Sequence, residues 1–423
     1  MIWLLFILLF LFFIINVPIA VALGLSASIV FIVQDSVPLV VMMQRMFAAA
    51  SNFPLLAIPF FILAGKIMEY GGISRRLIHL ANVIVGGIRG GLAMVSVMAC
   101  TFFGSISGSG AATTAAVGSL LIPSMVKKGY NRDFSTAIHA AAGGTAGIVL
   151  PPSVPLILYG VAASVNIGDL FIAGIIPGLF IALTLAAFVY AISVAKGYGG
   201  GESSGFKDFL LALMDAILPL LMPIIILGGI YGGIFTPTEA SVVAVVYALI
   251  LGLFIYREIK LKDLVDIFTA ATVTTSVIMF IIACAAIFGN LLARERVPEM
   301  ITSLMLGFTE SWIVALLLIN LALLILGTFM ETAAAIIILT PILVPIAVAM
   351  DINLVHFGII MIVNLAIGLI TPPVGINLFV AANIAGIKFE RIVIAILPFI
   401  LIMIVNLLII SFLPFMSLFL LNQ

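Results

Sequence analysis

The segment GSISGSGAATTAAVGSLL, residues 104–121, places glycines and hydroxyl side chains inside a long apolar stretch of the chain. Backbone that leaves the regular helix is costly in hydrocarbon, because its N–H and C=O groups find no water there. Such backbone is expected at membrane depth only where protein covers it or where it lines a cavity. The segment therefore predicts an irregular turn, which taken alone favours close helix packing over a role in binding.

The rest of the sequence is typical of a helical membrane protein. Of 423 residues, 65% are hydrophobic and 8% are charged, and the mean hydropathy is +1.43. Apolar runs of about 20 residues recur throughout the sequence, and this is the length that crosses a bilayer as a helix. The sequence does not show the short alternating segments of a membrane barrel. Basic and acidic residues balance at 17 each, so nothing indicates a nucleic-acid partner. Cys100 and Cys284 lie in apolar runs and are expected to be buried, with neither a disulfide nor a metal site.

The apolar runs predict an all-α polytopic protein with about ten spans and two re-entrant hairpins. The first run, MIWLLFILLFLFFIINVP, has no basic n-region and no A-x-A-like cleavage site, so we interpret it as a retained helix. The hairpins are predicted at 92–126 and 311–349, each too long for one span and broken near its middle by small or polar residues. The spans are predicted at 2–16, 19–42, 54–70, 134–163, 170–195, 209–231, 237–256, 264–293, 355–385 and 391–418.

Composition and charge divide the chain into four regions. GYGGGESSGFKD, at 197–208, is the one clear flexible linker in the sequence. The regions are N-terminal scaffold helices (1–53), a first repeat with hairpin 92–126 and broken helix 134–163 (54–196), the linker with further scaffold helices (197–263), and a second repeat with hairpin 311–349 and broken helix 355–385 (264–423).

Charges at the hairpin ends predict opposite orientations. Arg89 precedes the first hairpin and Lys127, Lys128 and Arg132 follow it, so both of its ends are expected in the cytoplasm. Glu310 and Asp351 flank the second hairpin without a nearby basic residue after it, so both of its ends are expected outside.

The two halves also share a sequence pattern. GSISGSGAA (104–112) aligns with GTFMETAAA (327–335), and GIVLPPSVP (147–155) aligns with GLITPPVGI (368–376). In each half the next aligned proline follows the second proline of the Pro-Pro pair by 25 residues. Small-residue clusters and single proline kinks usually serve helix packing, but here both features occur twice in the same order. Inverted repeats with broken helices are typical of secondary transporters.

The Pro-Pro breaks supply chemistry for binding a cation. Pro151 and Pro372 lack an N–H, so neither can bond the carbonyl four residues earlier, at Gly147 or Gly368. A desolvated cation is a suitable partner for carbonyls freed in this way. The helices that follow the two tips point their N-termini inward, which suits an anionic substrate group. The carbonyls in question belong to Gly147, Ile148, Gly368 and Leu369.

Single polar residues carry weaker signals. Glu331 at the second tip is either functional or a hydrogen-bond partner for that tip. Asn377 follows the second break and is a candidate to face substrate, whereas His139 is expected to be a packed, hydrogen-bonded side chain. Thr236 is expected to be an N-cap, with Pro237 at the first helical position and Glu239 in the first turn.

Five motifs together resemble the large membrane (M) subunit of TRAP (tripartite ATP-independent periplasmic) transporters. They are GSISGSGAATTAA, GIVLPPSVPLILYG, GIFTPTEAS, GTFMETAAAIIILTPIL and GLITPPVGINLF, and the resemblance covers essentially the whole chain. It implies a multi-pass protein of the bacterial inner membrane with an elevator-type ion-transporter fold, and a sodium-coupled importer of organic anions such as C4-dicarboxylates, sialic acid or other sugar acids, rather than an enzyme. It also implies a small four-helix membrane subunit, expected as a separate polypeptide, and a periplasmic substrate-binding protein as partners. No organic cofactor is expected.

The resemblance also implies site residues. The first Na+ site would use Ser105, Gly108, Gly147, Leu150 and Pro152, and the second would use Gly327, Gly368, Thr371 and Val374. Substrate would lie between the tips, near Ser107, Ser109, Thr332 and Asn377.

Two alternatives stay open at the level of sequence. One is a stand-alone sodium/anion symporter of the same fold that needs no binding protein. The other is an intramembrane serine protease that uses a tip serine with His139. The tip reads Gly-Ser-Ile-Ser-Gly, which does not match a Gly-x-Ser-Gly nucleophile motif, and a protease would leave the second hairpin unexplained.

Overall fold

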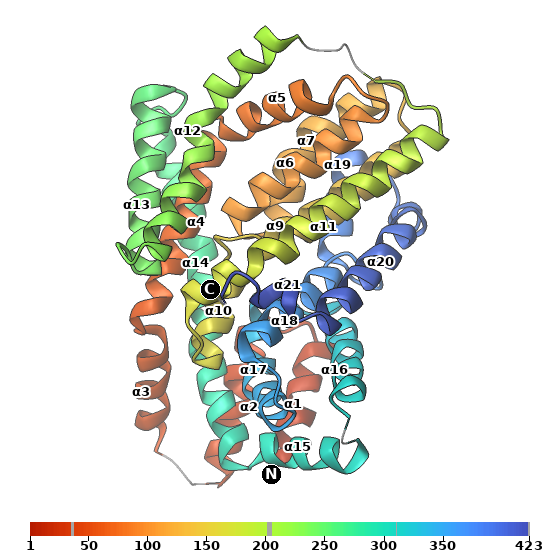
Figure 1. Cartoon of the computed structure of the whole chain (residues 1–423). Coiled ribbons are helices and arrows are strands. Elements are labelled where there is room, and N and C mark those ends of the chain that lie inside the picture. The colour runs from red at the N-terminus through yellow and green to blue at the C-terminus, as the bar shows by residue number, and fades with distance from the viewer. Residues whose placement is uncertain (35–37, 201–204, 310, 422–423) are drawn as a thin grey trace.

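The computed structural model describes residues 1–34, 38–200, 205–309 and 311–421. Within these ranges the chain forms helices and connecting segments, with no strand (Figure 1). Residues 35–37 of the predicted span 19–42, residues 201–204 of the predicted linker, and Glu310 lie outside the described ranges. Cys100 and Cys284 are buried, as expected of small apolar side chains.

One group of helices packs around the long helix α14. This helix contacts α2, α3 and α4, while α4 also packs on α13, which in turn contacts α12. The bounds are α1 (Ile2–Ile14), α2 (Ile19–Gln34), α3 (Leu39–Ala50), η1 (Phe53–Leu56), α4 (Ala57–Tyr70), α12 (Phe206–Tyr231), α13 (Pro237–Leu249), the π-helix η2 (Ile250–Ile255) and α14 (Asp263–Arg294).

The first hairpin and the first broken helix follow α4 in the chain. The two arms of the hairpin pack against each other, and its first arm also packs on both parts of the broken helix that precede the Pro-Pro break. The bounds are α5 (Ile73–Val85), α6 (Gly91–Ser107) and α7 (Gly110–Lys127) for the hairpin region, α8 (Arg132–Gly144), α9 (Ala146–Val149) and α10 (Val154–Ala163) for the broken helix, and then α11 (Ile167–Ala195).

The second half repeats this order of elements after α14. Here the arms of the hairpin lie further apart, and each of them packs against the first part of the second broken helix. The bounds are α15 (Val297–Phe308), α16 (Trp312–Gly327) and α17 (Thr332–Ala349) for the hairpin region, α18 (Leu354–Gly368) and α19 (Ile376–Ala385) for the broken helix, and then α20 (Phe389–Phe412) and α21 (Phe415–Leu418).

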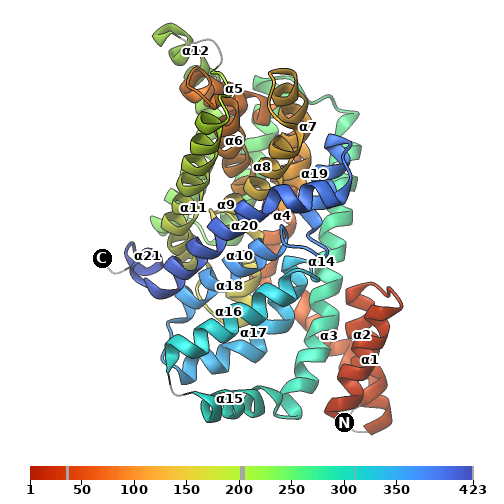
Figure 2. The same cartoon turned by 90° about the vertical axis from the view of Figure 1, so that its right-hand side faces the viewer.

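The two hairpins approach the middle of the molecule from opposite ends. In Figure 1, α5, α6 and α7 occupy the upper part, and α15, α16 and α17 the lower part. The packing is crosswise, because α7 packs on α19 of the other half and α17 packs on α10. Figure 2 shows the same arrangement from the side, with α19 next to α7. The turns and the breaks of both halves thus meet near the centre.

Seven described helices are long and apolar enough to cross a membrane, and an eighth candidate joins 132–149 to 154–163 across a bend of 46°. One of the seven, α17, is an arm of the second hairpin. Three of the ten predicted spans, 2–16, 19–42 and 355–385, lie instead in apolar helices of 10–17 residues. Since α2 ends at Gln34 and α3 begins at Leu39, the predicted helix 19–42 is two helices in the described structure.

Two helices, α5 and α15, were not expected from the apolar runs. In α5 the buried residues Ile73, Leu77, Leu80 and Ala81 recur at helical spacing, while Arg75 is exposed. Such a one-sided helix has too little apolar sequence to look like a span. In each half one of these helices comes directly before the hairpin in the chain. In space, α5 and α15 lie at opposite ends of the molecule (Figure 1).

Candidate functional site at the meeting point of the two hairpins

A cavity of about 570 Å³ lies where the two hairpin turns meet. One side of it is formed by the start of α2 and by α4 and α14, and the other by the first tip, the start of α17 and both Pro-Pro breaks. The cavity therefore lies between the helix group around α14 and the hairpins and broken helices, which also contact each other directly.

The first tip is built for a sharp turn. Helix α6 ends at Ser107, and Gly108 takes a left-handed conformation with φ of 63° that suits glycine. Ser109 is the N-cap of α7, since its Oγ accepts a hydrogen bond from the N–H of Ala112 at 3.3 Å. The hydroxyl of Thr113 lies 2.8 Å from Ser107 Oγ and donates to the Ser109 carbonyl at 2.8 Å. The hydroxyls of the tip therefore hold its irregular backbone in place.

Behind this tip, the first break packs directly on the hairpin. A Cβ added to Gly147 would lie 2.5 Å from Gly104 Cα, so only glycine fits this contact between α9 and α6. The peptide bond between Pro151 and Pro152 is cis. The Ile148 carbonyl accepts the Ser153 hydroxyl, whereas the Gly147 carbonyl accepts no hydrogen bond within the described residues.

The other predicted residues of the first Na+ site lie close by in sequence and structure. Ser105 is buried in the last turn of α6, and its Oγ donates to the Phe102 carbonyl at 2.8 Å. Its oxygen lone pairs stay available to a cation. Leu150 donates its N–H to the Ala146 carbonyl at 3.2 Å, at the end of α9.

The second break repeats the contact of the first. A Cβ on Gly368 would collide with the backbone of Gly327, at the end of α16. The peptide bond between Pro372 and Pro373 is also cis. Thr371 donates its hydroxyl to the Ile367 carbonyl at 2.7 Å, and Val374 is half-buried in the turn that follows.

The prediction of free carbonyls at Gly368 and Leu369 is wrong for the second break, because both of them accept a hydrogen bond. The N–H of Thr371 bonds the Gly368 carbonyl at 3.1 Å, and the N–H of Asn377 bonds the Leu369 carbonyl at 3.1 Å. The Gly368 carbonyl is therefore served by a residue that precedes the prolines, and the turn after Pro373 brings the Asn377 N–H to the Leu369 carbonyl. Each carbonyl oxygen retains a second lone pair for a cation.

The second tip differs from the first in its cap. Glu331 is the N-cap of α17, and its Oε2 accepts the N–H groups of Ala333 at 2.9 Å and Ala334 at 3.3 Å. The expectation that both helix starts suit an anionic substrate therefore holds less well for α17, because a carboxylate already occupies its positive end. The α7 start has only a serine cap.

Asn377 connects the two halves. It is fully buried, and its Nδ2 donates to the Ala140 carbonyl at 3.4 Å across the molecule. The same nitrogen would lie 2.9 Å from a Cβ on Gly110, at the start of α7. Its Oδ1 and the Thr332 hydroxyl oxygen are buried without a partner in the described residues.

All four residues predicted to lie near substrate, Ser107, Ser109, Thr332 and Asn377, line the cavity. Of the residues predicted for the sodium sites, Gly108 lines it as well, while the others lie behind it in the hairpins and breaks. The structure thus brings the predicted residues of both halves to one place.

A charged pair in the cavity was missed from the sequence. Lys66 and Glu69 of α4 both line it, with 2.8 Å between Nζ and Oε2. The sequence did contain a signal for this pair. Both residues are ionisable and lie inside the predicted span 54–70, and ionisable groups in membrane helices are usually functional.

His139 and Thr236 have the structural roles that the sequence indicated. His139 is buried in α8 with Nδ1 2.8 Å from the Ser135 carbonyl, and no hydrogen bond joins it to a tip serine in the described residues. At the start of α13, the Thr236 side chain accepts the Glu239 N–H at 3.3 Å, and Glu239 accepts the Thr236 N–H at 2.8 Å.

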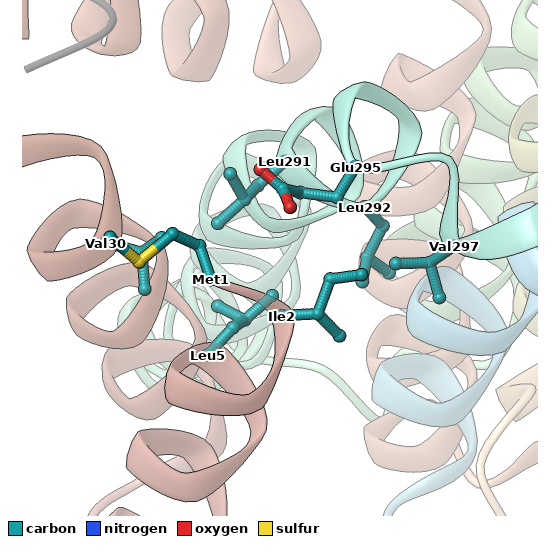
Figure 3. A pocket seen from close by; sticks show the side chains of 8 residues that line it. All are labelled: Met1, Ile2, Leu5, Val30, Leu291, Leu292, Glu295 and Val297. Atoms are coloured by element: carbon teal, nitrogen blue, oxygen red, sulfur yellow. The ribbon is translucent and has the colours of Figure 1, made fainter. Parts of the chain in front are cut away.

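A second hollow, between α1, α2 and α14, has no comparable chemistry (Figure 3). Its lining is apolar except for Glu295, which accepts a hydrogen bond from Gln34 Nε2 at 2.8 Å. It leaves no room for a water molecule.

Comparison with known proteins gives the context of the site. The chain is 47% identical over 410 residues to an isethionate TRAP transporter permease protein, DctMQ, of Oleidesulfovibrio alaskensis, covering 97% of this chain and 64% of that protein. It thus spans less than two thirds of this relative. It is 43% identical to the C4-dicarboxylate TRAP transporter large permease protein of Pseudomonas aeruginosa, covering 95% of this chain and 94% of the relative. It is 38% identical to the sialic acid TRAP transporter large permease protein of Vibrio cholerae, covering 90% of each.

The fold also has a counterpart among solved structures. The crystal structure of the YdaH transporter of Alcanivorax borkumensis superposes with a TM-score of 0.62 over 88% of this chain and 87% of that one, at 13% identity. The family model described as "Tripartite ATP-independent periplasmic transporter, DctM component" matches residues 6–416. These relatives are transporter permeases rather than enzymes, which leaves the protease alternative without support. The chain belongs to the DctM family, the large permease components of TRAP transporters.

Proposed function

We propose that this protein imports organic anions across the bacterial inner membrane, driven by a sodium gradient. The observation that carries the proposal is the cavity at which both hairpin turns meet, with buried polar atoms of Thr332 and Asn377 left unpartnered in its wall. Buried polar atoms are normally hydrogen-bonded, so these two suit a polar ligand. The relatives named for C4-dicarboxylate, sialic acid and isethionate transport suggest a carboxylate or sulfonate.

The charge of the cavity supports a role for cations. Glu69 and Glu331 oppose the single ammonium of Lys66 among the described lining residues. An anion would enter such a cavity against like charge unless positive charge bound nearby. Sodium ions at the two breaks, next to the Gly147 carbonyl and the Gly368 carbonyl, would offset the carboxylates and make anion binding depend on sodium.

The anion would bind next to the start of α7. The N-terminus of this helix carries a serine cap, whereas that of α17 is neutralised by the Glu331 carboxylate. Ser107 and Ser109 hydroxyls, the Thr332 hydroxyl and the Asn377 amide complete the polar surroundings. The hairpins and broken helices would move as a body along the helices around α14, in the manner of an elevator, with the cavity between the two parts.

Its partners would be a small membrane subunit and a periplasmic binding protein, as for a TRAP transporter. The end of the molecule with α5 would face the cytoplasm, because Arg75, Arg76, Arg89, Lys127 and Lys128 lie there.

Uptake by proteoliposomes tests the proposal. The complex of both membrane subunits would be supplied with binding protein and with radiolabelled succinate, N-acetylneuraminate or isethionate, under an inward gradient of Na+ or of K+. We expect accumulation of at least one anion with Na+ only. Equal uptake in K+ would refute sodium coupling, and full uptake without the binding protein would instead favour a stand-alone symporter.

A further inference from the structure

Lys66 holds an unusual position for a charged residue in a membrane helix. It lies in α4, within the apolar span Phe53–Tyr70, and it lines the cavity beside the hairpin tips. A lysine near a helix end often extends toward the membrane surface. Here the ammonium is held in the cavity wall by Glu69, at 2.8 Å, and the two side chains are 26% and 32% exposed.

Lys66 is also the one basic side chain among the described residues that line the cavity. The unpartnered Thr332 hydroxyl, which can donate to a carboxylate or sulfonate oxygen, lines the same cavity. On the hairpin side the described lining residues offer an anion hydroxyl, amide and helix N-terminal donors, and their one positively charged side chain lies on the α4 side.

We infer that Lys66 is an anion-binding residue that pairs with the acidic group of the substrate, and that Glu69 is the partner it leaves when substrate binds. The inference rests on the proposed transport of an anion. An ion pair between residues three apart on a helix face is weakly held, so exchanging one carboxylate partner for another costs little. A lysine ammonium is a compact charge with rotatable donors, and it therefore fits a carboxylate and a sulfonate alike.

The two members of the pair make opposite predictions on this account. Removing Lys66 removes the charge that the anion needs. Removing the charge of Glu69 removes a competitor of the anion and leaves the ammonium free. A pair that only stabilises α4 would make both changes harmful in the same way.

The test measures anion binding to the purified complex of both membrane subunits, without binding protein. The half-saturating concentration for thermal stabilisation is determined for succinate, N-acetylneuraminate and isethionate, at fixed Na+, with wild type, Lys66→Met, Lys66→Arg and Glu69→Gln. Lys262→Met, at an exposed lysine outside the cavity, is the matched control.

We expect Lys66→Met to raise the half-saturating concentration about tenfold or more, the usual effect of losing a charge-assisted hydrogen bond. Lys66→Arg should restore most of the affinity, Glu69→Gln should bind as tightly as wild type or more tightly, and Lys262→Met should match wild type. The inference fails if Lys66→Met binds like wild type, if Glu69→Gln weakens binding as Lys66→Met does, or if none of the three anions stabilises the wild type. Repeating the series in K+ distinguishes failure of sodium coupling from failure of the Lys66 inference. If the wild type binds the anion equally well in K+, sodium coupling is contradicted, but the comparison of the Lys66 variants with wild type still stands.

Discussion

At the scale of single residues, two glycine pairs determine how closely each hairpin packs on its broken helix. Gly104 faces Gly147 in the first half, and Gly327 faces Gly368 in the second. Each contact joins backbone to backbone, so the carbonyls at the break lie next to the end of the hairpin arm. The sequence alignment placed these four glycines in equivalent positions, and the structure gives the reason: a side chain at either break would push hairpin and break apart.

Replacing Gly147 or Gly368 with alanine should therefore impair sodium-dependent transport. The added methyl would collide with the opposite backbone, and overpacking of this kind typically costs about 1–3 kcal/mol. We expect uptake to fall at least tenfold and the sodium concentration for half-maximal uptake to rise, in proteoliposome assays. Gly289→Ala is the matched control, because its Cβ would meet nothing within 4 Å. Wild-type sodium dependence in both break variants would contradict the assignment of cation sites there.

Asn377 is one of several residues whose side chains bond from one half to the other, and it does so beside the cavity. Asn377→Ala would remove a hydrogen bond to Ala140, worth about 1 kcal/mol, and a buried amide of a residue that lines the cavity. We expect a modest fall in melting temperature together with about a fivefold or greater rise in the KM for the anion. A variant with lower stability but unchanged KM would show that Asn377 only joins the two halves.

At the scale of elements, the two helix starts at the tips are not equivalent. A serine caps α7, and a glutamate caps α17. The sequence placed Ser109 and Glu331 at the tips but did not show which groups they bond, because this depends on the backbone conformation after each turn. In the proposed function, this difference is the reason for placing the anion on the α7 side of the cavity.

Changing Glu331 to alanine should destabilise α17. It removes an acceptor of two N–H groups, and the loss of such a cap costs about 0.5–2 kcal/mol. Thr236→Ala removes a comparable cap at α13, where Thr236 is paired with Glu239. We expect both variants to lower the melting temperature by similar amounts, and only Glu331→Ala to change sodium-dependent uptake. If both variants transport alike, Glu331 has a capping role alone.

The amphipathic helices show where sequence patterns were insufficient. Hydropathy located the hairpins and breaks because they interrupt long apolar runs, but α5 and α15 have short one-sided patterns of the kind that surface helices share. Arg76 of α5 pairs with Asp215 at 3.1 Å and with Glu258 at 2.8 Å. These contacts between distant segments hold α5 against α12 and the segment after η2, and no local pattern could reveal them.

At the scale of the whole molecule, the sequence predicted the two-fold plan and the residues at its centre. Glycine, hydroxyl and Pro-Pro positions are local features, and their order is the same in both halves. The sequence could not show that α7 packs on α19 and α17 on α10, since this crosswise packing depends on the whole fold. The sequence does show Lys66 and Glu69 as a charged pair inside a predicted span, but their place in the cavity depends on the packing of α4 on α13 and α14.

The central claim is that cations bound at the breaks make the cavity between the tips suitable for an anion. Its most direct test is the affinity of the membrane complex for succinate, N-acetylneuraminate and isethionate as the Na+ concentration is varied against K+ at constant ionic strength. Linkage requires that the anion strengthen sodium binding by the same factor by which sodium strengthens anion binding. We predict that saturating Na+ tightens binding of the preferred anion by about tenfold or more, a coupling of roughly 1.4 kcal/mol. Equal anion affinity in Na+ and K+ would contradict the account.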